Sequence, residues 1–229
     1  RGVKYACDSP TCGPGCDCDR YMELWNLVFS QFNHNDDGTY TPLPRKNIDT
    51  GMGLERLVSL VQGAETNYGT DLFMPYINHV EKLTGKKYTA SPENRMAMNV
   101  IADHVRAVVF AISDGAAPSN EGRGYVIRRL LRRAVRFGGS LGLKQPFLCE
   151  MVPLVAQVMH QPYPEVSTRA DFISKIVRLE EERFLETLDD GTALFMNMVK
   201  ELKAKGETIV TGELAFRLYD TFGFTVDLT

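Results

Sequence analysis

The sequence predicts an α+β protein in which a small antiparallel sheet precedes a mostly α-helical domain. The first observation is a two-residue alternation of side chains over residues 22–33, followed by a polar turn at 35–38. The second is a change to helical periodicity from about residue 70 onward. The pattern shifts near residue 65, so we expect one domain over 1–64 and a second over 65–229.

The alternating segment is predicted to form one arm of a hairpin. Residues 22–33 carry aromatic and β-branched side chains without a breaker, and their alternation places Asn26 and Val28 on one face. After the turn, residues 39–43 return as the antiparallel partner. Residues 47–51 are predicted to form a third strand.

The remaining elements are predicted to be helices. A Ser-Pro-Glu-Asn sequence at 91–94 is a start signal, with proline at the first helical position, and Gly85 is the expected stop of the helix before it. The predicted helices cover 54–62, 71–83, 92–113, 125–137, 145–160, 169–189 and 193–203, and a short segment at 212–220 closes the chain.

Composition limits the classes of protein that fit this chain. Its 229 residues are 44% hydrophobic and 24% charged, which is ordinary for a globular protein with a sizeable core. The formal net charge of -3 excludes a uniformly basic nucleic-acid-binding arm. The sequence contains no run of about 18 apolar residues, so no transmembrane helix is predicted. No signal peptide opens the chain, so a cytoplasmic location is expected. The chain starts at Arg1 without a methionine and ends at Thr229 inside an apolar stretch, which suggests part of a longer protein.

A glycine-rich junction at 47–57 carries the first candidate site. Gly51 and Gly53 lack a Cβ, so a flat ligand could lie against the backbone there. Arg56, one turn into the following helix, could bind phosphate oxygens, and Asp49 could hold an ammonium group. This pairing suggests a site that joins an amino acid to a nucleotide. The alternative is a plain strand-to-helix turn with a surface arginine.

The helix predicted at 125–137 is dense in arginine. Its apolar residues fall on one stripe, so the arginines face outward and could neutralise phosphates. The alternative is a solvated face that pairs with an acidic run farther along the chain, and the two uses can coexist. The arginines are Arg128, Arg129, Arg132, Arg133 and Arg136, with Arg123 in the preceding loop, and the acidic run is Glu180, Glu181, Glu182 and Glu186.

Asn120 lies in the glycine-rich loop before the arginine-rich helix. An asparagine offers a donor and an acceptor together, so it can read the edge of a base. The helix start beside it also favours anions. The alternative is that Ser119 and Asn120 form a turn or a helix cap.

Four cysteines lie within a dozen residues near the start of the chain. Their loop is rich in proline and glycine and could wrap a tetrahedral Zn²⁺, although a single-residue gap between two of them is uncommon. The alternative is a flexible insertion with free thiols. The four residues are Cys7, Cys12, Cys16 and Cys18. The four histidines show no metal-ligand spacing, and His104 fits a hydrogen-bonded core residue better than a catalyst.

These segments together resemble one known family. Residues 49–56 resemble motif 3 of the class II aminoacyl-tRNA synthetases, in the form typical of alanyl-tRNA synthetases, and residues 24–29 resemble the strand before it. Residues 118–125 with the arginines that follow, and residues 218–229, resemble the tRNA-recognition helical domain of those enzymes. The resemblance implies that 1–64 is the C-terminal part of a catalytic domain with a cysteine-rich insertion at 7–18, and that 65–229 is the tRNA-recognition domain.

The resemblance implies roles for the hairpin residues. Arg56 would contact the ATP γ-phosphate as the catalytic arginine, and Gly51 and Gly53 would form the floor under adenosine and substrate. Asp49 would bind the α-amino group of alanine, with Gly51 beneath it. Asn26 would help to fix the amino acid, and Val28 would shape a small side-chain pocket.

The resemblance also implies RNA-binding roles. Asn120 and Asp220 match the pair that reads a wobble G·U base pair in the tRNA(Ala) acceptor stem, which suits an amide and a carboxylate. The arginines would position the RNA backbone without carrying sequence information. The residues concerned are Arg123, Arg128, Arg129, Arg132 and Arg133.

The parent enzyme would activate alanine with ATP and Mg²⁺ and pass it to tRNA(Ala). Nothing in the sequence resembles motifs 1 and 2 of the class, which supply the α-phosphate arginine and most of the sheet, and the oligomerising region is absent too. We therefore expect that this chain alone does not form alanyl-adenylate. The alternatives are a non-catalytic RNA-binding module and a helical domain that binds an acidic protein.

Overall fold

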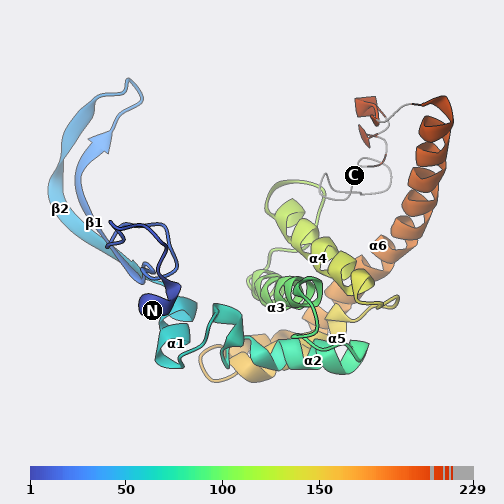
Figure 1. The fold of residues 1–229 in the computed structure, drawn as a ribbon, viewed down its shortest axis with the longest axis horizontal. Helices are drawn as coiled ribbons and strands as arrows, with labels where there is room; N and C mark the ends of the chain where they lie inside the picture. The colour runs from blue at the N-terminus through green and yellow to red at the C-terminus, as the bar shows by residue number, and fades with distance from the viewer. Residues whose placement is uncertain (207–208, 214, 217, 219–229) are drawn as a thin grey trace. The chain divides into compact units, whose positions relative to one another are not determined.

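A computed structural model of the chain describes residues 1–206, 209–213, 215–216 and 218. Its contacts divide the chain into two compact units, Arg1–Leu72 and Phe73–Thr229, which are described separately below. The first unit carries strands and the second is helical, so the predicted α+β class is confirmed (Figure 1).

The first unit consists of a cysteine-rich loop, a long hairpin and one short helix. The strands are β1 (Trp25–His34) and β2 (Tyr40–Met52), and the helix is α1 (Leu54–Val61). Two single-turn 3₁₀ helices, η1 (Val3–Tyr5) and η2 (Asn67–Gly69), lie near the ends of the unit. The hairpin turns at Gly38, whose φ of 81° is easy only for glycine.

The third strand predicted at 47–51 is wrong. Residues 40–43 and 47–51 belong to the two ends of a single strand, β2, because β1 pairs with both ends. The register passes from Ser30↔Asn47 to Phe32↔Pro42, so an irregularity separates the ends, and Pro44 lies inside it. A proline cannot donate a ladder hydrogen bond but is tolerated at such a bulge, so the strand continues on both sides of it.

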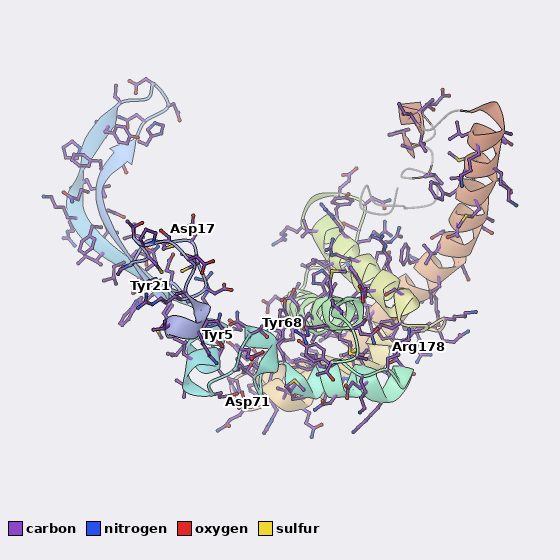
Figure 2. The ribbon with its side chains drawn as sticks, in the orientation of Figure 1. Tyr5, Asp17, Tyr21, Tyr68, Asp71 and Arg178 are labelled. Atoms are coloured by element: carbon purple, nitrogen blue, oxygen red, sulfur yellow. The ribbon has the colours of Figure 1, made fainter. Side chains whose placement is uncertain are left out.

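The hairpin has no layer packed on it within the described part of its unit. Figure 2 shows its side chains projecting on both sides of the ribbon. Trp25 and Phe29 are each 61% exposed and Ile48 is 64% exposed. Two strands alone bury too little to be stable, so this hairpin has the character of a sheet edge that needs further partners.

The second unit is a bundle of five helices in its described residues. They are α2 (Met74–Thr84), α3 (Pro92–Ser113), α4 (Gly122–Ser140), α5 (Leu148–Met159) and α6 (Pro164–Lys205). The predicted signals act as expected: the Ser91 side chain accepts the Asn94 N–H at 3.1 Å, and Gly85 ends α2 in the left-handed conformation.

Helix α3 lies at the centre of the bundle and contacts α2, α4, α5 and α6. Met98, Ile101 and Val109 of α3 are fully buried, as are Leu131 of α4 and Phe184 of α6. The 22 residues of α3 have the length and apolar composition of a membrane span, but half of its apolar stretch is buried, a pattern that a core helix also gives.

The two helices predicted at 169–189 and 193–203 are one continuous helix, α6. Gly191 lies between them, and a single glycine costs a helix about 1 kcal/mol without breaking it. The arginine-rich helix α4 is longer than the predicted 125–137, since it begins at Gly122 and continues to Ser140.

Candidate functional site

The register of the hairpin brings the predicted amino-acid-binding residues onto one face. Asn26 lies opposite Gly51, and Val28 lies opposite Asp49. Directly opposed residues of an antiparallel pair share a face, as do residues two apart along one strand. All four therefore line the same side of the hairpin, and a Cβ built at Gly51 would meet no atom within 4 Å, so the backbone there is open to a ligand.

Gly53 forms the junction between β2 and α1. Its N–H donates to the Leu24 carbonyl at 3.0 Å, which ties the end of the hairpin to the segment just before β1. A Cβ at Gly53 would lie 3.2 Å from Cδ of Arg56. Glycine at this position therefore leaves room for the Arg56 side chain to fold back over the junction.

Arg56 is exposed and lies in the first turn of α1. Its Nη1 donates to the backbone carbonyl of Glu23 at 2.7 Å. The Glu23 carboxylate in turn accepts from Nδ2 of Asn26 at 3.2 Å. Glu23 thus connects the two predicted ligand-binding side chains. The predicted strand 22–33 includes Glu23, but β1 begins only at Trp25, and the sequence does not show the contacts of Glu23 with Arg56 and Asn26.

Asp49 and its neighbours are held by local hydrogen bonds. Oδ1 of Asp49 accepts the N–H of Thr50 at 2.8 Å. The Thr50 hydroxyl accepts a hydrogen bond from Nε1 of Trp25 across the hairpin. The Asp49 carboxylate is exposed and keeps lone pairs for an ammonium group.

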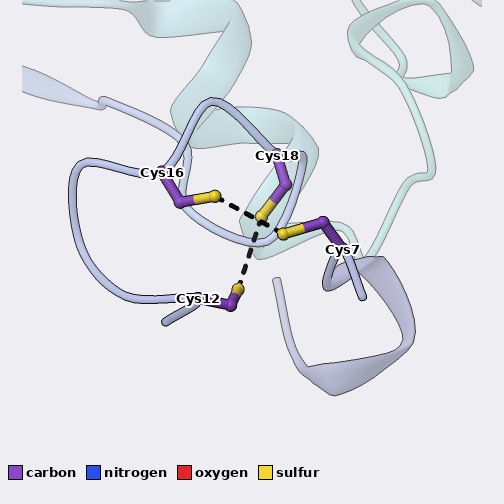
Figure 3. A group of neighbouring side chains, drawn as sticks. All are labelled: Cys7, Cys12, Cys16 and Cys18. Carbon is purple, nitrogen blue, oxygen red and sulfur yellow. Dashed lines mark hydrogen bonds between the residues drawn. The ribbon is translucent and has the colours of Figure 1, made fainter. Parts of the chain in front are cut away.

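The four clustered cysteines converge on one point in the first unit. Figure 3 shows their sulfur atoms directed toward one another. Their Sγ atoms all lie within 4.8 Å of one another, with 3.5 Å between Cys7 and Cys16 and 3.6 Å between Cys12 and Cys18. The backbone N–H of Arg20, together with that of Cys7, lowers the pKa of the Cys18 thiol to about 6. Among the described residues this is the only group of three or more potential metal ligands.

In the second unit, two arginines of α4 pair with a buried carboxylate of α6. Nε of Arg128 and Nε of Arg132 each lie 2.9 Å from Oε1 of Glu180, whose side chain is 5% exposed. The Arg132 guanidinium also lies over the ring of Phe184, 5.0 Å from its centroid. Two of the arginines predicted to bind RNA therefore also hold α4 against α6. This is the pairing with the acidic run that the sequence suggested as the alternative to phosphate binding.

Asn120 is exposed in the loop before α4, and its Oδ1 accepts from Nη1 of Arg128. The loop is packed tightly against the start of the helix, because a Cβ at Gly124 would overlap Ser119 and the carbonyl of Ala117. Gly122 begins the helix with a φ of 57°, a conformation that favours glycine. Glycine therefore holds Asn120 close to the first turn of α4.

The remaining arginines of α4 differ in exposure. Arg123 and Arg129 are exposed, whereas Arg133 and Arg136 are half-buried with their guanidinium groups over Phe137. Asp220, the second predicted base reader, lies outside the described residues.

The acidic run is divided between two uses. Glu181 is fully buried, and its carboxylate accepts the backbone N–H groups of Phe147, Leu148 and Cys149 at 2.8–2.9 Å. It therefore caps the start of α5 rather than pairing with an arginine. Burial raises the pKa of Glu181, although the three N–H groups favour its charged form.

His104 lies on the apolar stripe of α3. Nδ1 of His104 lies 2.9 Å from the carboxylate of its neighbour Asp103, and its side chain is mostly buried on α3. No histidine belongs to a metal-ligand group in the part of the chain that the structure describes.

An α+β chain with a glycine-rich strand-to-helix junction and an arginine-rich helix fits an aminoacyl-tRNA synthetase of class II. The chain belongs to the family described as tRNA synthetases class II (A), whose sequence profile it matches over residues 1–229.

Its similar relatives are alanine–tRNA ligases of bacteria. The chain is 56% identical over 231 residues to that of Geobacillus kaustophilus (strain HTA426), 57% to that of Listeria monocytogenes serotype 4b (strain F2365) and 55% to that of Bacillus subtilis (strain 168). Each alignment covers 100% of this chain and 26% of the relative, so the chain spans about a quarter of their length. The predicted resemblance is confirmed, and the roles of individual residues stay predictions.

Proposed function

We propose that the chain supplies the motif 3 hairpin and the acceptor-stem-binding helices of an alanine–tRNA ligase. In the complete reaction the carboxylate of alanine attacks the α-phosphate of ATP, pyrophosphate leaves, and the alanyl group then passes to the 3′ end of tRNA(Ala). The observation that carries the proposal is the shared hairpin face of Asn26, Val28, Asp49 and Gly51 in a chain that matches the class II family from end to end.

The hairpin face suits a small amino acid. The exposed Asp49 carboxylate would bind the α-amino group, and Asn26, oriented by Glu23, would hold the other end of the amino acid. Val28 lies opposite Asp49 and would limit the space for a side chain, which favours alanine over larger residues. The open backbone at Gly51 would receive the planar part of the nucleotide.

Arg56 would provide the positive charge for the ATP phosphates. A guanidinium group can bind two phosphate oxygens at once, and its exposure leaves it accessible. The hydrogen bond from Nη1 to the Glu23 carbonyl holds the Arg56 side chain near the start of β1. The other N–H groups of the guanidinium can then bind a ligand.

Mg²⁺ would accompany the phosphates of ATP, because it is usually held by one or two carboxylates together with substrate phosphates rather than by a cage of protein ligands.

The amino-acid role can be tested by NMR titration of the isotope-labelled chain with alanine. We expect shifts at Asn26, Val28 and Gly51 that disappear in Asp49→Asn, because the amide cannot neutralise an ammonium group. Asp37→Asn is the matched control, since that carboxylate lies at the hairpin turn and bonds only to Thr39 among its described contacts. Equal titration by Asp49→Asn and the unmodified chain would contradict the role.

The second unit would bind the acceptor stem. Arg128 occupies the Oδ1 of Asn120, so the Asn120 NH₂ group is left as the donor that would face a base. The exposed Arg123 and Arg129 would contact phosphates, and Arg128 and Arg132 would contribute despite their pairing with Glu180, since two positive charges face one carboxylate there. Asp220 is proposed as the partner of Asn120.

The RNA-binding role can be tested with substitutions at Asn120 and Arg123. We expect Asn120→Ala to reduce the preference for a G·U over a G·C acceptor stem, and Arg123→Ala to weaken binding to both stems alike and to reduce its salt dependence. If Asn120→Ala changed neither affinity nor preference, the base-reading role would be wrong.

The chain alone should not make alanyl-adenylate. No segment of the sequence resembles the motif that supplies the α-phosphate arginine in class II synthetases. The negative charge that develops on the α-phosphate would therefore lack stabilisation. Alanine-dependent ATP–pyrophosphate exchange by the purified chain, at a rate near that of a complete ligase, would contradict this expectation.

A further inference from the structure

The four-cysteine loop has the geometry of a tetrahedral metal site. A Zn²⁺ ion with Zn–S bonds of about 2.3 Å holds its four sulfur atoms about 3.8 Å apart. The Sγ separations of 3.5 Å for Cys7–Cys16 and 3.6 Å for Cys12–Cys18 lie close to that value, and every other pair is within 4.8 Å. No sulfur pair therefore exceeds the separation in a zinc site by more than about 1 Å. The four side chains already point toward a common centre (Figure 3).

Two disulfide bonds explain this geometry less well. A disulfide requires an S–S distance of about 2.05 Å within each pair and places no demand on the distance between pairs. Here all four sulfur atoms gather within one sphere, which only a shared ligand requires. All four cysteines are free thiols in the structure.

Hydrogen-bond donors lie around the sulfur atoms. The backbone N–H groups of Cys7 and Arg20 donate to Sγ of Cys18, and the N–H of Cys18 donates to Sγ of Cys16. The guanidinium group of Arg20 lies 3.8 Å from Sγ of Cys12 and offsets part of the negative charge of a four-thiolate centre. Such outer contacts orient the ligands of metal sites.

We propose that Cys7, Cys12, Cys16 and Cys18 bind one Zn²⁺ ion, and that the ion fixes the segment that leads into β1. Each thiol gives its proton to solvent as its sulfur atom bonds to the metal. Soft thiolate ligands and tetrahedral geometry select zinc over the hard cations that prefer oxygen. Metal content can be measured without alanine, ATP or RNA, so the site stands or falls separately from the proposed ligase function.

The position of the site gives the ion its effect. Cys18 precedes the Glu23–Leu24 pair by only a few residues, and the Tyr21 N–H donates to the Cys18 carbonyl at 3.3 Å. The Glu23 carbonyl holds Arg56, and the Leu24 carbonyl holds the N–H of Gly53. A metal that anchors Cys18 therefore restrains the segment to which the candidate site residues are bonded.

The first experiment measures metal in the full chain purified under reducing conditions from zinc-supplemented medium. We expect about one zinc per chain in the unmodified protein and in Cys149→Ser, which removes a thiol outside the cluster. Cys18→Ser should hold zinc at least roughly tenfold more weakly against a competing chelator. Should Cys18→Ser fail to fold, Co²⁺ added to the metal-free unmodified chain should give the intense visible absorption of tetrahedral thiolate coordination.

Several results would overturn the site. They are a metal-free unmodified chain that takes up neither zinc nor cobalt, iron in place of zinc, equal zinc retention by Cys18→Ser, or Cys7–Cys16 and Cys12–Cys18 disulfides found by alkylation and mass spectrometry.

The second experiment tests the effect on the hairpin by hydrogen exchange with and without the metal. Removal of zinc should speed exchange of the Gly53 amide, which is bonded to Leu24, more than exchange of the Thr39-bonded amide of Asn35 at the far turn. Equal acceleration at both amides, or none at Gly53, would show that the metal does not restrain the segment before β1.

Discussion

Glu181 offers a sharp test of how the helical unit is held together. Its side chain is fully buried in α6, and its two carboxylate oxygens accept the N–H groups of Phe147, Leu148 and Cys149. These are donors at the N-terminus of α5, where the helix itself supplies no acceptor. One side chain therefore caps α5 and fastens it to α6.

The cost of removing this carboxylate can be worked from the contacts. Each buried donor left without a partner costs about 1–3 kcal/mol, so Glu181→Ala should lower the free energy of unfolding by at least about 3 kcal/mol. Glu181→Gln keeps one oxygen for two of the donors but turns an NH₂ group toward the third. It should therefore cost less, about 1–3 kcal/mol.

Denaturant unfolding followed by circular dichroism measures these differences. Glu182→Ala is the matched control, because Glu182 is the adjacent residue of the same helix but is exposed, and it should change the free energy of unfolding by about 0.5 kcal/mol or less. If Glu181→Ala cost no more than Glu182→Ala, the capping role and the packing of α5 on α6 would be wrong.

Two further predictions concern the same unit. Burial raises the pKa of Glu181, so its protonated form stabilises the fold fully below the ordinary glutamate pKa, and this contribution is lost as the pH rises through the raised pKa. The difference in unfolding free energy between the unmodified chain and Glu181→Gln should therefore shrink with rising pH. A difference that stays constant or grows with pH would contradict this prediction. Gly124→Ala should destabilise the chain by about 1–3 kcal/mol, because its Cβ would overlap Ser119 and the Ala117 carbonyl. Gly139→Ala in the same helix meets open space and should be neutral or stabilising by up to about 1 kcal/mol. Thermal melts that rank the two variants the other way would refute the packing of the Asn120 loop.

Local patterns in the sequence were enough to predict the hairpin face and most helices. Alternation placed Asn26 and Val28 together, and the register then added Asp49 and Gly51 opposite them. The capping signals at Ser91 and Gly85 also acted as predicted. These features depend on neighbours in the chain, which a sequence displays directly.

Features that depend on distant partners were not predicted. The continuity of β2 through Pro44 depends on its pairing with β1 on both sides of the irregularity. Helix α6 continues through Gly191 because the low helix propensity of one glycine is outweighed there. Glu23 gained its importance only from Arg56 and Asn26.

The division of the acidic run left a signal that sequence reasoning did not use. Glu180 and Glu181 continue the buried stripe of Ile173, Val177 and Phe184 at helical spacing. Two carboxylates on a core stripe must find partners, and the structure shows Arg128 and Arg132 for one and the start of α5 for the other.

Recognition of the tRNA(Ala) acceptor stem by the helical unit is the central proposal. The most direct measurement is a gel-shift comparison of the unmodified chain with two RNA minihelices that differ only in a G·U or G·C pair at the recognition position, at low and moderate salt. We expect tighter binding to the G·U minihelix than to the G·C minihelix at both salt concentrations, with the affinity for both RNAs falling as salt rises. Equal affinity for the two hairpins, or no binding to either, would contradict the account.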